Sequence, residues 1–434
     1  MAFDPERQRD RVALSGQRRR ALHFEAITAA FMRYTHTMRS VVRLVSLTAL
    51  SATLLLLPLA HAVDAPVAAP AAAPVPPPPT IAAKSYVLVD AYSHQMLAGQ
   101  NETARVDPAS LTKLMTSYAV FAALRDGKLK LDQEVIVSEH AWRAGGAVTD
   151  GSTSFLELNS KVKVEDLLQG MIVQSGNDAT IALAEALAGS ESTFAALMNQ
   201  YSERLGLTGS HWNNSSGVPD PDPLHYTTAR DIAILSAAIA TEFPQYYHYF
   251  SQKSFTFNGH KQDNRNRLLL RDPTVDGLKT GHTQEAGYCL AASALRNGTR
   301  FISVVMGTDS FAAREDASAA LLGYGFNFFE TRKLYSAAQS VGTAHVWKAS
   351  EMADVVLHQD VAATVPRGLA EAAKATLVLD KRIIAPVAAS QAVGKLRVMQ
   401  GDKLLAELPV YPAHDVPAGG FFRRLIDTIR LWFV

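Results

Sequence analysis

The chain has 434 residues, 48% of them hydrophobic, which is enough for two or three domains with buried cores. Its formal net charge is +1, so no strong basic field points to nucleic acid as a partner. The single cysteine, Cys289, excludes an intramolecular disulfide and a cysteine-based structural zinc site, and we expect it to be a buried apolar residue.

Residues 1–62 have the layout of a leader that contains a secretory signal peptide. An uncharged apolar run from Leu44 to Leu59 follows two arginines, and the small-x-small sequence Ala60-His61-Ala62 comes directly after it. This is the order of the charged, apolar and cleavage regions of a signal peptide. An uncleaved N-terminal anchor is the alternative. The Arg-rich residues 1–37 are too long for a charged region, so Met38 is a candidate translation start.

An Ala/Pro-rich linker, residues 63–83, precedes a first folded domain that we expect at residues 84–335. Residues 64–83 contain seven of the 20 prolines, which is typical of a semi-extended spacer. Strand patterns stand at both ends of the domain, with helical patterns between them. Strands are predicted at 85–90, 95–98, 254–257, 278–280, 288–294 and 301–307, and helices at 110–125, 164–173, 178–188, 192–205, 227–241 and 314–331. This order predicts a sheet with helices packed on it.

Residues 336–418 predict a small all-β domain. Short runs of Val, Leu and Ala are broken there by Gly, Pro and Asp, as in strands joined by turns. The strand-like runs lie at 355–357, 376–379, 395–398 and 404–410.

Residues 419–434 form a distinct tail after a Gly419-Gly420 joint. From residue 421 the apolar side chains recur at helical period, opposite Arg423, Arg424, Asp427 and Arg430. An amphipathic helix with aromatics on one face and arginines on the other is typical of a membrane interface. At 14 residues, 421–434 is too short to span a bilayer. A helix docked on its own protein is the alternative.

Three short motifs carry chemistry. Ser110 and Lys113 stand three residues apart in a predicted helix, so both side chains lie on one face. The spacing alone discriminates little, because a second Ser-x-x-Lys match begins at Ser160. Ser175-Gly176-Asn177 lies between two helical patterns, and Lys279-Thr280-Gly281 lies in a strand pattern. The ordered set S-x-x-K, S-D-N and K-T-G is that of penicillin-binding proteins and class A β-lactamases, although the middle motif here is S-G-N.

A serine hydroxyl becomes a good nucleophile only when a base takes its proton. No Ser-His-Asp set is evident, so Lys113 is the candidate base for Ser110, and its pKa must fall from about 10.4 to about 7–8. Burial and a nearby cation both lower a lysine pKa, and Lys279 can be that cation. Ser175 is the candidate proton relay to the leaving amine, and Asn177 can bond to Lys113 and to a substrate carbonyl.

With these motifs the chain resembles a low-molecular-weight penicillin-binding protein of the serine-type D-alanyl-D-alanine carboxypeptidase family. The likeness runs from about Ala82 to Val434 and rests on 108–115, 173–179, 225–229, 275–283 and 286–288. It implies a transpeptidase/β-lactamase-like α/β domain, an antiparallel sheet with helices on both sides, followed by the β-rich domain and the terminal helix. In Gly151–Leu156 the family's usual methionine is missing, so the resemblance does not predict the shape of the cleft there.

The resemblance also implies the reaction, which is hydrolytic removal of the terminal D-Ala from peptidoglycan stem pentapeptides through an acyl-Ser110 intermediate. It implies no metal and no cofactor. The backbone N–H groups of Ser110 and His282 would form the oxyanion hole. The substrate-binding residues would be Lys279, Thr280, Gly281, His282 and Arg314. Arg314 would bind the substrate carboxylate, and an ion pair with Glu315 or Asp316 is its alternative role.

The resemblance further implies a periplasmic enzyme of a Gram-negative bacterium, held on the outer face of the inner membrane by residues 421–434 and acting in cell-wall biogenesis. Its partners would be stem peptides ending in D-Ala-D-Ala and β-lactam inhibitors that acylate Ser110. Two alternatives are a serine β-lactamase and a non-catalytic wall-binding scaffold. A class A β-lactamase needs a deacylating glutamate, and no Glu-x-x-Leu-Asn follows Ser175-Gly176-Asn177.

Overall fold

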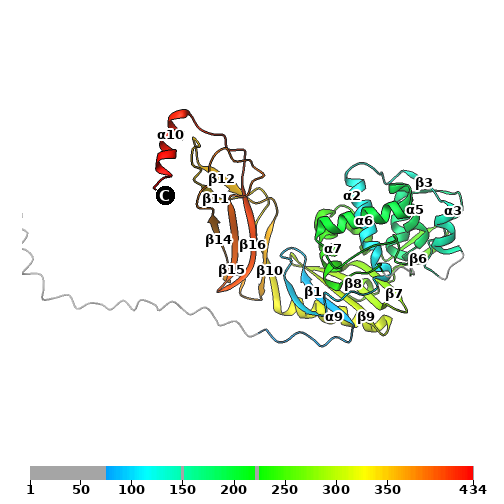
Figure 1. Cartoon of the computed structure of the whole chain (residues 1–434). Helices are drawn as coiled ribbons and strands as arrows, with labels where there is room; N and C mark the ends of the chain where they lie inside the picture. The colour runs from blue at the N-terminus through cyan, green and yellow to red at the C-terminus, as the bar shows by residue number, and fades with distance from the viewer. Residues whose placement is uncertain (1–74, 148–150, 220–223, 434) are drawn as a thin grey trace, which may run out of the picture. The chain divides into compact units, whose positions relative to one another are not determined.

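The computed structural model describes residues 75–147, 151–219 and 224–433 (Figure 1). The predicted signal peptide, the candidate start at Met38 and most of the Ala/Pro-rich linker lie outside these residues.

A five-stranded antiparallel sheet forms the centre of the first domain. Its strand order is β2 (Met96–Gln100), β1 (Ser85–Asp90), β9 (Thr299–Thr308), β8 (Gly287–Arg296) and β7 (Val275–Thr283). The N-terminal hairpin of β1 and β2 therefore joins strands that follow it by about two hundred residues, with Leu88 opposite Ser303. The predicted antiparallel sheet is confirmed, and this topology brings the ends of the domain together.

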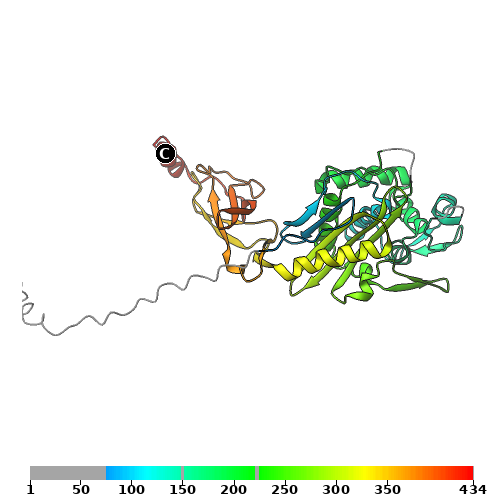
Figure 2. The ribbon, with the colours of Figure 1, turned by 90° about the horizontal axis from the view of Figure 1, so that it is seen from below.

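Both faces of this sheet are covered. Every residue of β1 is buried, and alternate side chains enter different cores because successive residues of a strand point to opposite faces. Val87 and Val89 join the core shared with the middle helices, whereas Tyr86 and Leu88 join the core under helix α9 (Phe311–Phe328). Figure 2 shows α9 lying across one face of the sheet. The predicted arrangement of helices on both sides of the sheet is thus observed.

The middle of the chain is mainly helical. A 3-10 turn at Ala109–Leu111 leads into α2 (Thr112–Arg125), whose residues are buried from Thr112 to Leu124. The other helices are α3 (Glu139–Trp142), α4 (Val164–Gln169), α5 (Asn177–Ala188), α6 (Glu191–Leu205), α7 (Ala229–Glu242) and α8 (Leu268–Arg271). Two small hairpins complete the domain, β3 (Glu134–Ile136) with β4 (Lys161–Lys163) and β5 (Ser254–Phe257) with β6 (His260–Asp263).

Helix boundaries differ from the sequence pattern where capping decides them. The closing helix, predicted at 314–331, begins at Phe311 because the Ser310 side chain accepts a hydrogen bond from the Ala313 N–H. It ends at Phe328, since Phe329 adopts an extended conformation and enters strand β10. The helix predicted at 164–173 is α-helical only to Gln169 and continues as a π-helical turn.

The C-terminal residues form an all-β domain with a core of its own, as predicted. β10 (Phe329–Tyr335) pairs with β13 (Val361–Pro366). A second sheet has the order β11 (Ser340–Ala344), β12 (Ala353–Val356), β16 (Lys403–Pro412), β15 (Gly394–Gln400) and β14 (Ala373–Leu379). Val355, Val398 and Val410 are fully buried in this core.

The chain ends in an amphipathic helix, α10 (Phe421–Arg430), as predicted. Across the described residues, no single helix has the length and apolar character needed to cross a membrane. One bent pair, α5 with α6, meets that test on length and composition only.

Candidate active site

The Ser-x-x-Lys motif lies where α2 begins beside strand β7. Lys113 Nζ lies 3.0 Å from Ser110 Oγ, so the two side chains meet on one helix face as their spacing predicts. Gly281 of β7 packs on this turn. A Cβ atom at Gly281 would lie 3.2 Å from the Pro108 carbonyl oxygen and 3.3 Å from the Leu111 nitrogen. The glycine of Lys-Thr-Gly therefore lets the strand approach the serine closely.

Lys113 is buried and has three hydrogen-bonding partners. Besides Ser110 Oγ, its Nζ contacts Asn177 Oδ1 at 2.8 Å and the Ser216 carbonyl oxygen at 2.6 Å. The amide oxygen and the carbonyl oxygen can only accept, so they take two N–H bonds. A neutral amine then has its lone pair left for the hydroxyl of Ser110. The contacts thus suit a lysine that acts as a base.

The pKa of Lys113 is lowered to about 7, first by burial and then by the positive charge of Arg265. The sequence interpretation gave that role to Lys279, and this was wrong. Burial and the charge of Lys113 hold the pKa of Lys279 itself well below its usual value. The guanidinium of Arg265 is therefore the cation that acts on Lys113. Lys279 Nζ donates to the Thr280 carbonyl at 3.0 Å.

Arg314 reaches the same region from α9. Its Nη1 donates to the Gly281 carbonyl at 3.1 Å, and burial lowers its pKa to about 10, so it remains charged at neutral pH. The alternative ion pairs with Glu315 and Asp316 are absent from the described part of the chain, where Arg271 takes both carboxylates, at 3.7 and 2.9 Å.

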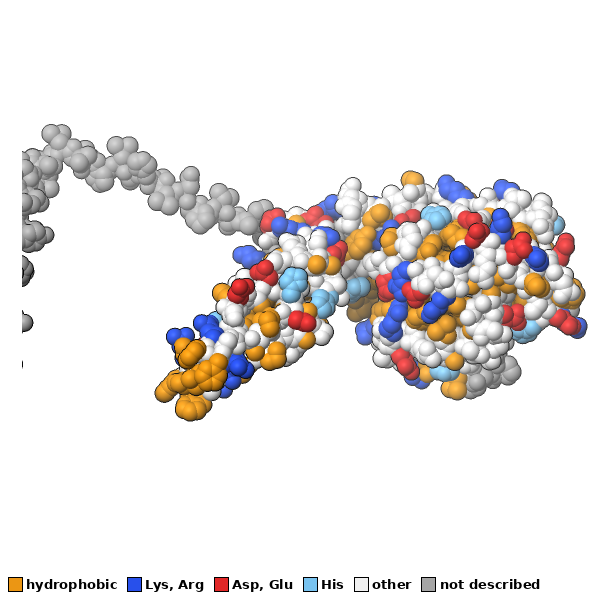
Figure 3. Space-filling model, turned by 90° about the horizontal axis from the view of Figure 1, so that it is seen from above, with side chains coloured by type: hydrophobic (Ala, Val, Ile, Leu, Met, Phe, Trp, Pro, Cys, Tyr) orange, Lys and Arg blue, Asp and Glu red, His pale blue; other side chains and the backbone are white. Residues whose placement is uncertain are grey.

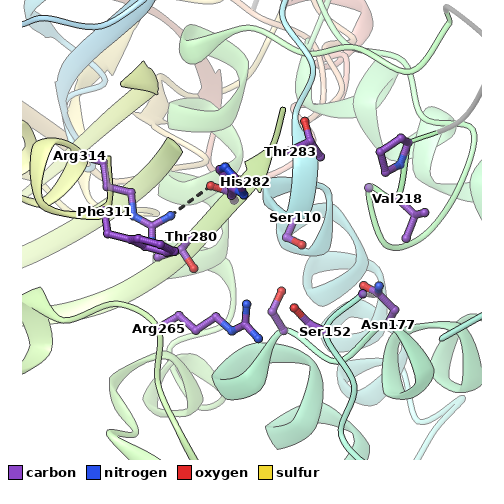
Figure 4. Close-up of a pocket in the computed structure, with 15 residues that line it drawn as sticks. Ser110, Ser152, Asn177, Val218, Arg265, Thr280, His282, Thr283, Phe311 and Arg314 are labelled. Carbon is purple, nitrogen blue, oxygen red and sulfur yellow. Dashed lines mark hydrogen bonds between the residues drawn. The ribbon is translucent and has the colours of Figure 1, made fainter. Parts of the chain in front are cut away.

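The three motifs line one cavity of about 310 Å³ (Figure 4). Its lining includes Ser110, Ser152, Ser175, Asn177, Arg265, Thr280, Gly281, His282, Phe311 and Arg314. Figure 4 shows Arg314 and Phe311 on the side away from Asn177, with Ser110 between them. A nucleophile that contacts a buried amine therefore shares one space with two guanidinium groups, an arrangement suited to acyl transfer from an anionic substrate.

Comparison with known proteins agrees with this geometry. The family model described as D-alanyl-D-alanine carboxypeptidase matches residues 71–310, and that of the penicillin-binding protein 5 C-terminal domain matches residues 329–418. The chain is 41% identical to D-alanyl-D-alanine carboxypeptidase DacA of Escherichia coli over 363 residues, which are 83% of this chain and 90% of that protein.

The chain belongs to the D-alanyl-D-alanine carboxypeptidase family. Among solved structures, penicillin-binding protein 5 from Haemophilus influenzae is 41% identical with a TM-score of 0.72, covering 78% of this chain and 99% of that one. Penicillin-binding protein D2 from Listeria monocytogenes, solved in an ampicillin-bound form, is 28% identical with a TM-score of 0.53, covering 58% of this chain and all of that one. The chain is therefore a serine-type hydrolase of this family.

Ser175 differs from the other motif residues. It adopts a left-handed conformation with φ of 68° between the helical turn at Gly170–Gln174 and α5, and it lines the cavity. Its buried hydroxyl has no hydrogen-bond partner among the described residues, so the structure brings Asn177 to Lys113 but leaves Ser175 unbonded. A hydroxyl in this state is available to a group of the substrate.

The loop that lacks the family's methionine is held by Asp178. The Asp178 carboxylate accepts from the Thr153 hydroxyl and from the Ser154 and Leu156 N–H groups, at distances of 2.7 to 3.1 Å. Ser152, just before these residues, lines the cavity. The wall of the cavity at this point is therefore formed by a short polar loop.

Sequence reasoning missed Arg265 and Ser216. Arg265 lies in no recognisable motif, and Figure 4 shows its guanidinium directed across the cavity toward Ser152. Ser216 acts through a backbone carbonyl, which leaves no side-chain signature. The second Ser-x-x-Lys match is unrelated to the site, because Ser160 Oγ donates to the Glu157 carbonyl in a surface turn. Cys289 is fully buried and burial raises the pKa of its thiol to about 11, as expected for an apolar residue.

Proposed function

We propose that the chain removes the terminal D-Ala from peptidoglycan stem peptides that end in D-Ala-D-Ala, through an acyl intermediate on Ser110. The observation that carries the proposal is the environment of Lys113. Asn177 Oδ1 and the Ser216 carbonyl oxygen can only accept, so they bind the two N–H groups of the neutral amine. The lone pair of its nitrogen is left to face Ser110 Oγ. With a pKa of about 7, a substantial fraction of this amine is neutral at physiological pH.

In the acylation step, Lys113 takes the hydroxyl proton while Ser110 Oγ attacks the carbonyl carbon of the penultimate D-Ala. The negative charge on the carbonyl oxygen is stabilised by the backbone N–H groups of Ser110 and His282. The C–N bond then breaks, and the proton passes from Lys113 through Ser175 to the departing amine. The free hydroxyl of Ser175 suits this relay because no other described residue occupies it.

In the second step, water attacks the acyl-enzyme and releases the shortened peptide. Lys113 is again placed to take a proton, since it lies beside the ester oxygen of Ser110. No metal or cofactor enters the proposal.

The carboxylate of the leaving D-Ala is bound at the opposite end of the cavity by Thr280, Arg314 and the amine of Lys279. Arg314 is buried, charged and free of carboxylate partners within the described ranges, and its Nε has no acceptor there. A substrate carboxylate would supply that acceptor. β-Lactams present a carbonyl and a carboxylate in the same way, so we propose that they acylate Ser110.

For the whole chain we propose a catalytic domain at 84–335, a β-rich domain at 336–418 and a membrane-attaching segment at 419–434, preceded by the leader 1–62 and the linker 63–83. Its location would be the cell envelope of a Gram-negative bacterium, on the periplasmic face of the inner membrane. The open apolar face of α10 supports attachment, since Phe421, Phe422 and Ile429 are exposed.

The test compares Ser110→Ala with Ser160→Ala, the matched serine of the second Ser-x-x-Lys sequence. Ser110→Ala should abolish fluorescent-penicillin labelling and D-Ala release from diacetyl-Lys-D-Ala-D-Ala with unchanged circular dichroism. Ser160→Ala should retain both activities. Mass spectrometry of the digest identifies the bond cleaved, and rapid turnover of penicillin would instead indicate a β-lactamase. Labelling that persists in Ser110→Ala would refute the assignment.

A further inference from the structure

Helix α10 shows its apolar side to the outside and buries an acid. Phe421, Phe422 and Ile429 are 65%, 77% and 47% exposed, whereas Asp427 is fully buried. An amphipathic helix that docks on its own domain does the opposite, because its apolar face provides the stabilisation. Figure 3 shows the apolar side chains gathered at one end of the C-terminal part, with basic side chains beside them.

Two separate contacts hold this helix to the β-rich domain. Before its first turn, the Gly419 N–H donates to the Lys348 carbonyl at 2.7 Å. About two turns further, the Asp427 carboxylate accepts from the Lys348 N–H at 2.8 Å and pairs with Arg423 at 3.2 Å. One peptide unit on each side of Lys348 is thus clamped, and Lys348 itself has a positive φ of 65°. Because α10 is held at both of these points, its orientation on the domain is fixed, and the Gly419-Gly420 joint does not act as a free hinge in this structure.

The contact through Asp427 also keeps the helix folded before any membrane is met. α10 has only 10 residues, and isolated helices shorter than about 12–15 residues are marginal in water. Free in solution, such a segment would have to be ordered at the moment of binding, which weakens affinity. Held by Asp427, it presents its apolar residues as a preformed face.

We propose that Asp427 is the positioning residue of a preformed membrane-binding face, and that the occupant of this face is an anionic lipid bilayer surface. The charge of the helix favours anionic lipids, because Arg424 and Arg430 take part in no ion pair within the described ranges. The inference rests on the membrane attachment proposed above. It adds how the helix is oriented and which residue orients it.

A matched pair of variants separates orientation from charge. Asp427→Asn and Asp427→Ala both remove one negative charge, but only asparagine keeps an oxygen that can accept from the Lys348 N–H. Binding of the full chain is measured by co-sedimentation with vesicles of phosphatidylglycerol and phosphatidylcholine in equal amounts. Asp427→Asn should bind at least as tightly as the wild type, and Asp427→Ala about three- to tenfold more weakly than Asp427→Asn.

The sign of this difference is diagnostic. An independent helix would favour alanine, which has the higher helix propensity and no polar group to desolvate. Equal or tighter binding by Asp427→Ala would therefore overturn the positioning role while leaving membrane attachment intact. A wild type that does not bind the vesicles would overturn the occupant and the proposed attachment together. Without lipid, the Lys348 amide should exchange hydrogen faster in Asp427→Ala than in Asp427→Asn, and equal exchange would also refute the clamp.

Discussion

The rate at which penicillin acylates the free enzyme should follow the deprotonation of Lys113. The base must be neutral to accept the proton of Ser110, so activity is lost as the pH falls through the pKa of about 7. At pH 5 the neutral fraction is about 1%, against about one half at pH 7. The second-order rate constant should therefore fall about tenfold per unit below pH 6 and reach a plateau above about pH 8.

The measurement is the second-order rate constant for labelling by a fluorescent penicillin between about pH 5 and pH 10. This constant, like kcat/KM, reports the pKa values of the free enzyme. A lysine with an ordinary pKa of about 10.4 would give a rate that keeps rising tenfold per unit up to pH 10, and that result would refute the reasoning. Ser160→Ala provides a control that should reproduce the wild-type profile.

Changing the cation tests the cause of the shift. Arg265→Gln removes the positive charge that helps lower the pKa of Lys113, so the acid limb should move upward by roughly half to one pH unit. Arg265→Lys retains the charge and is the matched control. Arg265 also lines the cavity, but a change in substrate binding would alter the height of the profile and not the position of its limb. An unmoved limb in Arg265→Gln would exclude Arg265 as the cause.

Three further predictions follow from the same contacts. Asn177→Asp brings a carboxylate to the position where the amide oxygen lies 2.8 Å from Lys113 Nζ, so the acid limb should move upward by about one to three units in the labelling assay. Because the pKa of Lys113 is about 7 when folded and about 10.4 when unfolded, the unfolded chain binds the extra proton between these values. Burial of the charged amine therefore destabilises the folded chain fully below pH 7, and this destabilisation is relieved toward pH 10. The free energy of unfolding of the wild type relative to Lys113→Met should rise by about 3 kcal/mol between pH 7 and pH 9.5 in urea titrations. Arg314→Gln should lower kcat/KM for peptides with a free terminal carboxylate by about ten- to a hundredfold, with little effect on amidated peptides, as measured by mass spectrometry of the released product.

The sequence predicted the part of the site that depends on local geometry. Ser110 and Lys113 meet because three residues make nearly one turn of a helix, and the chain is helical at this point in the structure. The strands of the sheet were predicted for a similar reason, since their apolar runs are bounded by turns. Such features need no knowledge of distant partners.

What the sequence could not supply depends on contacts between distant segments. The cation beside Lys113 is Arg265, which comes from the segment before α8, and no spacing rule relates the two. The ion-pair alternative for Arg314 was open until the structure showed that Arg271 takes the neighbouring carboxylates. The sequence could not predict how α10 is attached for the same reason. The burial of Asp427 depends on a backbone N–H about eighty residues earlier.

The charges around the cavity bear on both halves of the reaction. The guanidinium of Arg265 lines this cavity and lowers the pKa of both Lys113 and Lys279 before substrate arrives. A substrate carboxylate in this cavity would offset part of that positive charge and so raise the pKa of Lys113. Lys113 then holds more firmly the proton it has taken from Ser110, until the leaving amine accepts it. The acid limb of kcat for a carboxylate substrate should consequently lie at higher pH than the limb of kcat/KM, because only the former reports the occupied site.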